Sequence, residues 1–422
     1  MKNQRIRTEL PGPKAREILA RDAQVVSPSY PREYPFVMSH GKGAEVWDVD
    51  GNRFLDFAAG IAVCSTGHSH PQVVEAIKAA AERFLHISSD YWHEGQVRLG
   101  ERMNELSPLK EPAMSFFAQS GTESVEGALK LARNVTGRGR FIGFLGGFHG
   151  RTMGSLSFTS SKYTQQKGFF PTMPGVTHVP YPNSYRPLLV GADQGQAVLR
   201  YIEEVLFTSN VPPTEVAAIL VEPIQGEGGY LVPPDGFLAG LRALCDRHGM
   251  LLIFDEVQCG VGRSGAPFAA NRAGVRPDLL TTAKALGAGF PVSALMLAPD
   301  VGARLRLEDL GTTFGGGPLA CAVVEAVIDI IESEGLIDNV RRMSSLIRER
   351  CIVGPVTAVQ GAGLLLGLRT SRPAREVQRE LLAAGIFAGT AADPNIVRLL
   401  PPFTLAEAHV AQLAATLAGL AP

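Results

Sequence analysis

The sequence lacks the features of a membrane, nucleic-acid-binding or disulfide-stabilised protein. No uninterrupted apolar run in its 422 residues approaches the roughly 20 residues of a membrane span. Its first residues have no apolar core of the kind that marks a signal peptide. Lys and Arg total 40 against 41 for Asp and Glu, so the net charge of -1 offers no basic surface for nucleic acid. We therefore expect a cytoplasmic protein with no membrane or nucleic-acid partner.

Cysteine is also scarce, with five scattered residues and no pair at metal-ligand or redox spacing. We expect reduced structural thiols and no metal site. These cysteines are Cys64, Cys245, Cys259, Cys321 and Cys351.

The chain is too long for one simple core, which predicts at least two lobes. The first forty residues are typical of an extended arm or short helix, and residues 44–57 form a hairpin pattern that turns at Asp50-Gly51. From about residue 115 to 298, short apolar runs alternate with helical patterns, which indicates a buried, mostly parallel sheet. After Pro318 a helix ending at Gly335 leads into further helices and strands.

This order predicts an α/β protein with a large domain around a mostly parallel sheet and a smaller α+β domain. We assign residues 1–60 to an arm and hairpin that complete the small domain, 61–320 to the large domain and 321–422 to the C-terminal small domain.

Ligands in such sheets bind beyond the carboxyl ends of the strands, and four motifs lie at predicted strand ends. The first is "QSGTES", where Ser120, Gly121 and Thr122 begin a helix whose free N–H groups can bind an anion. The same residues fit a capping box of Ser120 with Glu123. Alone, the motif leaves both interpretations open.

The second motif is "GGFHGRT". Phe148 and His149 offer flat rings, and the Arg151 guanidinium can donate a bidentate pair of hydrogen bonds to a carboxylate. The alternative is a glycine-rich loop with a surface arginine.

The third motif, "LLIFDEVQCGVGRSG", places Asp255 at the end of an apolar strand. A buried carboxylate needs a cationic partner, such as a protonated ring nitrogen. Val257 and Gln258 follow, one apolar and one hydrogen-bonding. A turn cap or a pair with a structural arginine is the alternative.

The fourth motif is "LLTTAKALGAGFPVSA", in which Lys284 lies among small and apolar residues. A poorly hydrated lysine becomes a nucleophile for a carbonyl, whereas most lysines are solvated surface charges. Together, the four motifs fit one ligand, a phosphorylated aromatic aldehyde with a ring nitrogen. We therefore predict pyridoxal 5'-phosphate (PLP) as the cofactor.

Between Val37 and Thr404 the chain resembles the class III aminotransferases, which are fold-type I PLP enzymes, and within them most resembles the 4-aminobutyrate aminotransferases. The resemblance rests on the motifs above together with "VEPIQGEGG" and "GTTFGGGPLACA", in family order. It implies a homodimer, possibly a tetramer, with the PLP site at the subunit interface.

The resemblance also implies a role for each site residue. Gly121, Thr122 and Thr313 of the partner subunit would bind the phosphate, Phe148 and Val257 would cover the two ring faces, and Gln258 would bond the phenolic oxygen. Asp255 would pair with the ring nitrogen and Lys284 would be the Schiff-base lysine, with Ser120 and His149 completing the cofactor set.

For the substrates, an amino donor and 2-oxoglutarate or glutamate, the implied residues are Ile61, Arg151, Glu222, Glu227 and Arg398. Arg151 would bind a carboxylate of the substrate. Glu227 would neutralise Arg398 while an ω-amino acid is bound and release it for the second carboxylate of 2-oxoglutarate.

These residues predict transfer of the amino group of an ω-amino acid, with 4-aminobutyrate as the main hypothesis, to 2-oxoglutarate. Acetylornithine or ornithine aminotransferase is the first alternative, since "GIAV" around Ile61 also occurs in the acetylornithine branch. The others are a PLP-dependent racemase or epimerase and a non-catalytic protein of this fold.

Overall fold

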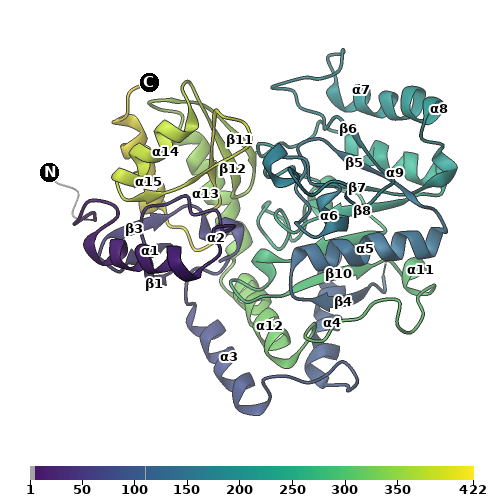
Figure 1. The fold of residues 1–422 in the computed structure, drawn as a ribbon, viewed down its shortest axis with the longest axis horizontal. Helices are drawn as coiled ribbons and strands as arrows, with labels where there is room; N and C mark the ends of the chain where they lie inside the picture. The colour runs from purple at the N-terminus through teal and green to yellow at the C-terminus, as the bar shows by residue number, and fades with distance from the viewer. Residues whose placement is uncertain (1–4, 110) are drawn as a thin grey trace.

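The computed structural model describes residues 5–109 and 111–422 and consists of two lobes. The larger lobe surrounds a seven-stranded sheet, and the smaller one brings the N-terminal and C-terminal segments together (Figure 1). The predicted α/β fold with a mostly parallel central sheet is therefore confirmed. None of the helices within the described residues combines the length and apolar character that a membrane span needs.

The central sheet has the strand order β4-β10-β9-β8-β7-β5-β6. Only β10 runs against its neighbours, because it pairs antiparallel with both β4 and β9, while the other pairs are parallel. The carboxyl ends of the other six strands therefore lie at one edge. The strands are β4 Met114–Ala118, β5 Arg140–Phe144, β6 Val176–Val179, β7 Val216–Val221, β8 Leu251–Asp255, β9 Leu279–Thr282 and β10 Ser293–Leu297.

Helices cover both faces of this sheet. Successive strand residues point to opposite faces. In β7, Leu220 joins the apolar cluster that contains α5 (Gly121–Thr136). Its neighbour Ile219 joins the cluster that contains α9 (Phe237–His248). All six residues of β7 are buried, which explains why the strand is an unbroken apolar run.

The smaller lobe contains two four-stranded sheets, ordered β1-β2-β3-β13 and β11-β12-β15-β14. The predicted hairpin forms, with β2 antiparallel to β3, and Leu55 of β3 then pairs in parallel with Ile386 of β13. The N-terminal hairpin thus extends a C-terminal strand, while the boundaries at residues 60 and 320 stay a prediction. The strands are β1 Met38–Lys42, β2 Glu45–Asp48, β3 Arg53–Asp56, β11 Val356–Ala362, β12 Leu365–Thr370, β13 Ile386–Phe387, β14 Gly389–Thr390 and β15 Ile396–Leu399.

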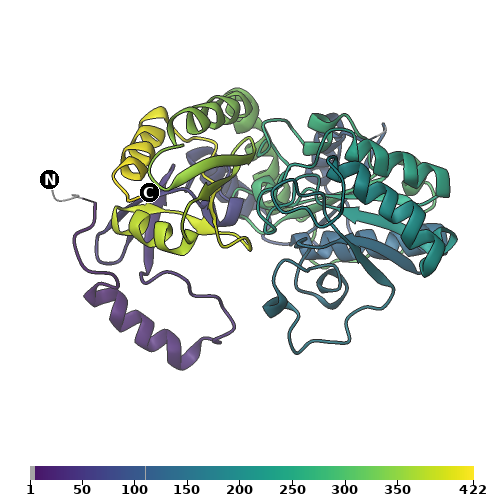
Figure 2. The ribbon, with the colours of Figure 1, turned by 90° about the horizontal axis from the view of Figure 1, so that it is seen from above.

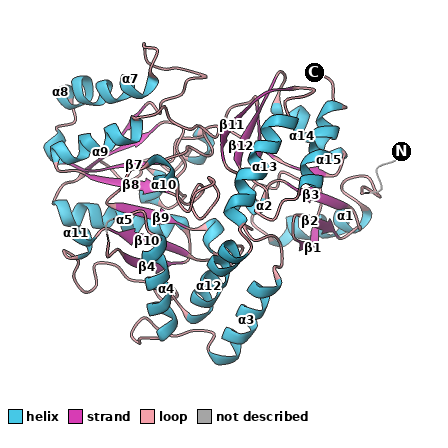
Figure 3. Ribbon diagram, turned by 180° about the vertical axis from the view of Figure 1, so that it is seen from behind, coloured by secondary structure: helices cyan, strands magenta, loops and turns pink. Residues whose placement is uncertain are grey.

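The N-terminal arm contains a thirteen-residue helix, α1 (Pro13–Val25), on the outside of the smaller lobe (Figure 2). The helix predicted after Pro318 is α12 (Pro318–Ser333), which packs on α3 (Pro71–Arg83) and α4 (Glu94–Leu106) below both lobes (Figure 3). Gly335 lies two residues beyond its end, in the left-handed conformation that begins the next helix. The other helices of more than five residues are α7 Gln194–Arg200, α13 Leu336–Arg350, α14 Ala374–Ala383 and α15 Glu407–Ala418, with a π-helical stretch at Tyr201–Leu206.

Candidate active site

The four motifs meet in one cavity at the carboxyl edge of the central sheet. Its volume is about 380 Å³. The loop after β4, the loop after β5, the end of β8 and the segment after β9 all reach it, because these strands run in the same direction. Eleven of the predicted residues line it: Ser120, Gly121, Thr122, Phe148, His149, Arg151, Glu222, Asp255, Val257, Gln258 and Lys284.

The N-terminus of α5 forms one wall of the cavity. A Cβ atom on Gly121 would lie 2.7 Å from Cγ1 of Val257, so the helix reaches Val257 only because this residue is glycine. The Ser120 hydroxyl donates to Glu123 over 2.7 Å and does not cap the N–H groups of the first turn. The Ser120–Glu123 contact of the alternative interpretation is present, and the N–H groups and helix dipole still favour an anion here.

Asp255 is buried and meets a histidine. Its Oδ2 lies 2.7 Å from Nδ1 of His149, and its Oδ1 accepts from the Val257 N–H and the Thr281 hydroxyl. Although burial works to lower it, the bond to Asp255 holds the pKa of His149 above its ordinary value. The protein itself thus provides His149 as one hydrogen-bond partner of this strand-end acid, while the ring nitrogen as its cationic partner stays a prediction.

Lys284 lies two residues beyond the end of β9 and adopts a strained backbone conformation. Its φ of 44° lies in the left-handed region, which non-glycine residues rarely adopt. Burial lowers the pKa of its amine, and the carboxylates of Glu227 and Asp255 oppose this change. Among the described residues Lys284 forms no salt bridge, so its amine is unpaired as well as partly buried. These are the conditions for a nucleophilic lysine.

Glu222 holds the Phe148 loop in place. Its carboxylate accepts hydrogen bonds from the backbone N–H groups of Phe148 at 3.2 Å and Gly226 at 3.1 Å. Burial raises its pKa to about 7. This predicted substrate residue thus also supports the wall of the cavity.

An ion pair next to the cavity joins the two lobes. Nη1 of Arg398, on β15, donates to Oε1 of Glu227 over 2.6 Å, and both side chains are nearly buried. Arg398 lies across the backbone of Gly389, where a Cβ atom would come within 2.1 Å of its Nε. Burial opposes the charge, but Tyr230 and Glu227 hold the pKa of Arg398 above its ordinary value. The predicted pair is present, although neither residue lines the cavity itself.

Two other predicted residues do not reach this cavity. Ile61 is 44% exposed, and Thr313 is exposed near the start of α12, away from the cofactor residues of its own chain. Thr313 as a contribution to the partner's site stays a prediction. Sequence reasoning missed other residues of the wall, namely Val63, Gln119, Gly150, Ala283, Gly289 and Val292. All six lie inside the motifs quoted above, which was the available signal.

PLP fits these residues. The start of α5 would hold its phosphate, Phe148 and Val257 would cover the two faces of its ring, and the Asp255 carboxylate could accept a hydrogen bond from a protonated ring nitrogen. Oε1 of Gln258 is buried with no hydrogen-bond partner among the described residues, so this amide is available to a ligand.

Comparisons with known proteins agree with this geometry. A sequence profile of the family described as "Aminotransferase class-III" matches residues 27–419. The chain is 41% identical to an acetylornithine aminotransferase of Myxococcus xanthus, over 88% of this chain and 90% of the relative. It is also 41% identical to one of Methanopyrus kandleri, over 91% and 94%.

Solved structures show the same resemblance. The ornithine aminotransferase of Toxoplasma gondii matches with a TM-score of 0.85 at 30% identity, over 96% of this chain and 94% of that chain. An omega transaminase of Pseudomonas jessenii in complex with PMP matches with a TM-score of 0.87 at 25% identity, over 94% and 96%.

Proposed function

This chain belongs to the class-III aminotransferases, PLP-dependent enzymes, and we propose that it transfers the ω-amino group of N-acetylornithine to 2-oxoglutarate. The observation that carries the transferase reaction is the Glu227–Arg398 pair beside Lys284. The choice of donor is supported by relatives of about 40% identity that are acetylornithine aminotransferases, which favours this alternative over the 4-aminobutyrate hypothesis.

When bound, PLP supplies the aldehyde that accepts the amino group and a ring that takes up electrons. Lys284 Nζ holds and moves the proton, because burial keeps a larger share of its amine uncharged than in water. Asp255 would keep the ring nitrogen of bound PLP protonated, and its bond to His149 fixes the orientation of the carboxylate. The α5 N-terminus and Gln258 position the cofactor.

Arg398 and Glu227 account for two substrates in one site. While the donor presents its ω-amine, Glu227 neutralises Arg398. When 2-oxoglutarate is bound, Arg398 takes the α-carboxylate and Arg151 the distal one. A racemase has no need to alternate between two such substrates, so the pair favours transamination.

A panel of donors tests the proposal. With 2-oxoglutarate as acceptor, kcat/KM is measured for N-acetylornithine, ornithine, 4-aminobutyrate, 5-aminovalerate and β-alanine. We expect N-acetylornithine to have the highest value. A higher value for 4-aminobutyrate would restore the first hypothesis, and loss of substrate chirality without any oxo acid would identify a racemase.

The switch is tested separately in single-turnover assays of the two half-reactions. Arg398→Ala should slow the half-reaction with 2-oxoglutarate by at least about 10-fold more than the half-reaction with the donor, because a charged hydrogen bond is worth roughly 1.5–3 kcal/mol. Equal losses in both would contradict this role of Arg398.

A further inference from the structure

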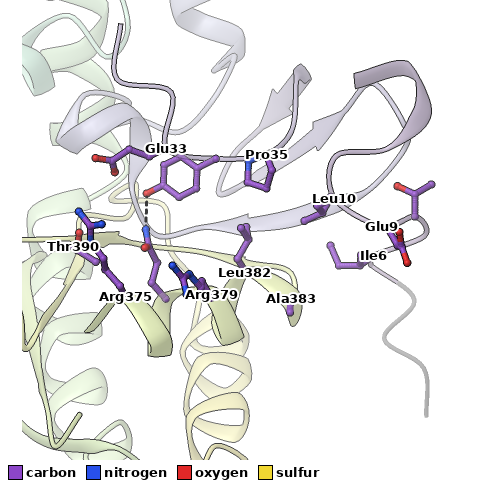
Figure 4. A pocket seen from close by; sticks show the side chains of 13 residues that line it. Ile6, Glu9, Leu10, Glu33, Pro35, Arg375, Arg379, Leu382, Ala383 and Thr390 are labelled. Carbon is purple, nitrogen blue, oxygen red and sulfur yellow. Dashed lines mark hydrogen bonds between the residues drawn. The ribbon is translucent and has the colours of Figure 1, made fainter. Parts of the chain in front are cut away.

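A second, larger cavity lies in the smaller lobe, between the N-terminal arm and α14. Its volume is about 640 Å³, which is in the range of small-molecule sites. Figure 4 shows Glu33, Arg375 and Thr390 at one end, Ile6, Glu9 and Leu10 at the other, and Pro35 and Leu382 between them. The cavity is thus charged at both ends, and Arg379 lies beside the apolar residues between them.

Four charged side chains line this cavity. In the described part of the chain, none of Glu9, Glu33, Arg375 and Arg379 forms a salt bridge or a hydrogen bond through its side chain. Arg375 and Arg379 are four residues apart and therefore lie on the same face of α14. Arg372, just before that helix, is paired with both Glu376 and Glu380. The guanidinium groups of Arg375 and Arg379 are therefore exposed and accessible to a ligand.

The pattern of charges defines the ligand. Arg375 and Arg379 match a carboxylate, and Glu33, at the Arg375 end, matches an ammonium group, which together is the head of an α-amino acid. Pro35, Leu382 and Leu10 match an apolar chain. Glu9, at the far end, matches a positive charge at the end of that chain.

One wall of the cavity also supports the active site. The Tyr34 hydroxyl donates to the carbonyl of Ala388 over 3.1 Å, and Gln378 of α14 donates to the same hydroxyl and the same carbonyl. Ala388 precedes Gly389, on whose backbone Arg398 lies. A change in α14 or Tyr34 therefore reaches Arg398 through directly bonded neighbours.

We propose that this cavity is a second small-molecule site, which binds an α-amino acid with a long basic side chain and changes the affinity of Arg398 for a substrate carboxylate. The binding site stands on the cavity alone. Its coupling to Arg398 rests on the function proposed above.

Binding is tested by calorimetry on the holoenzyme with Nε-trimethyl-L-lysine, whose side chain has no transferable amino group. We expect binding by the wild type and at least 10-fold weaker binding by Arg375→Ala/Arg379→Ala. Arg342→Ala, an exposed arginine of α13, is the matched control and should bind as the wild type does. The double variant should keep the wild-type melting temperature and basal turnover.

A second probe distinguishes the contribution of the charged chain end to binding from that of the amino-acid head. L-Norleucine has the same four-carbon chain without the terminal charge. Glu9→Gln should therefore weaken the binding of trimethyl-lysine and leave the binding of norleucine unchanged. Absence of trimethyl-lysine binding, or equal binding by the double variant, would overturn the site. Equal effects of Glu9→Gln on both probes would overturn the orientation.

The coupling is read from the KM for 2-oxoglutarate with and without trimethyl-lysine. We expect a change of about 5-fold or more in the wild type, typical of linked sites, and none in the double variant. Binding without a change in KM would overturn the proposed coupling to Arg398 but would still support the binding site. A failure of the proposed function would appear instead as absent turnover with 2-oxoglutarate. Calorimetry would still show whether the cavity binds trimethyl-lysine.

Discussion

At the scale of single residues, Lys284 is the side chain on which the proposed chemistry depends. Its amine is poorly hydrated, unpaired and held at a strained backbone position. We expect Lys284→Ala to lower kcat by at least about 100-fold, because a positioned proton-transfer group contributes that much or more. The visible absorption band of lysine-bound PLP should vanish with it.

Lys130→Ala is the matched control, since Lys130 is exposed on α5. It should keep both the band and the turnover. An Lys284→Ala enzyme with unchanged turnover would remove the basis of the mechanism.

A second residue-scale prediction concerns His68, whose Nε2 lies 2.7 Å from Oδ2 of the buried Asp56. The hydrogen bond to Asp56 raises the pKa of His68 to about 10. Because this folded-state pKa lies above that of the unfolded chain, about 6.5, the pair stabilises fully below pH 6.5 and loses its effect as the pH rises through 10.

Urea unfolding of the holoenzyme between pH 6 and 10 measures this effect. His68→Gln should be less stable than the wild type at pH 6, and the difference should shrink toward pH 10. His40→Gln, an exposed histidine of β1, should change little at any pH. A constant difference for His68→Gln across the range would contradict the linkage.

The sequence identified most residues of the cavity wall, and the reason is local. Asp255 and Lys284 each adjoin the end of an apolar strand, so strand direction alone brings them together. The His149–Asp255 bond joins residues 106 positions apart in the sequence and depends on how the loop after β5 folds back. No spacing rule predicts such a contact.

At the scale of elements, the start of α5 depends on the missing side chain of Gly121. In Gly121→Ala the new Cβ would press on Val257, and overpacking of this kind costs about 1–3 kcal/mol. We expect PLP to bind the apoenzyme roughly 5- to 100-fold more weakly, measured by titration with PLP.

Shortening the opposing residue should relieve the contact. Gly121→Ala/Val257→Ala should bind PLP more tightly than Gly121→Ala alone, and Gly100→Ala, with open space around its Cβ, should bind as the wild type does. If the double variant bound PLP no better than the single one, the steric explanation would be wrong.

Elements with a strong local pattern were predicted well, and those set by distant partners were not. The β2–β3 hairpin and α12 follow from a turn sequence and a helical apolar face. The reversed direction of β10 has no local signal, because a fully buried strand has the same apolar run in either direction. The β1-β2-β3-β13 sheet likewise joins segments more than 300 residues apart.

At the scale of the whole molecule, the two lobes meet at a charge pair. Glu227 follows β7 of the central sheet and Arg398 belongs to the smaller lobe, so the pair spans the boundary between the lobes. The Tyr34–Ala388 contact places the N-terminal arm against the same strand region. Segments from the start, middle and end of the chain thus meet near Arg398.

This arrangement predicts opposite effects for its two charges. Glu227→Gln leaves Arg398 without its counter-charge, so Arg398 no longer has to release a carboxylate before binding one. We expect the KM for 2-oxoglutarate to fall by at least about 5-fold, because a charged hydrogen bond of roughly 1.5–3 kcal/mol no longer competes. The donor half-reaction should slow, because the buried positive charge of Arg398 then faces an end of the donor that has no negative charge.

Glu215→Gln, which breaks the exposed pair with Arg140, should change neither half-reaction. A higher KM for 2-oxoglutarate in Glu227→Gln would show that Glu227 helps to orient Arg398 for the acceptor and does not compete with it.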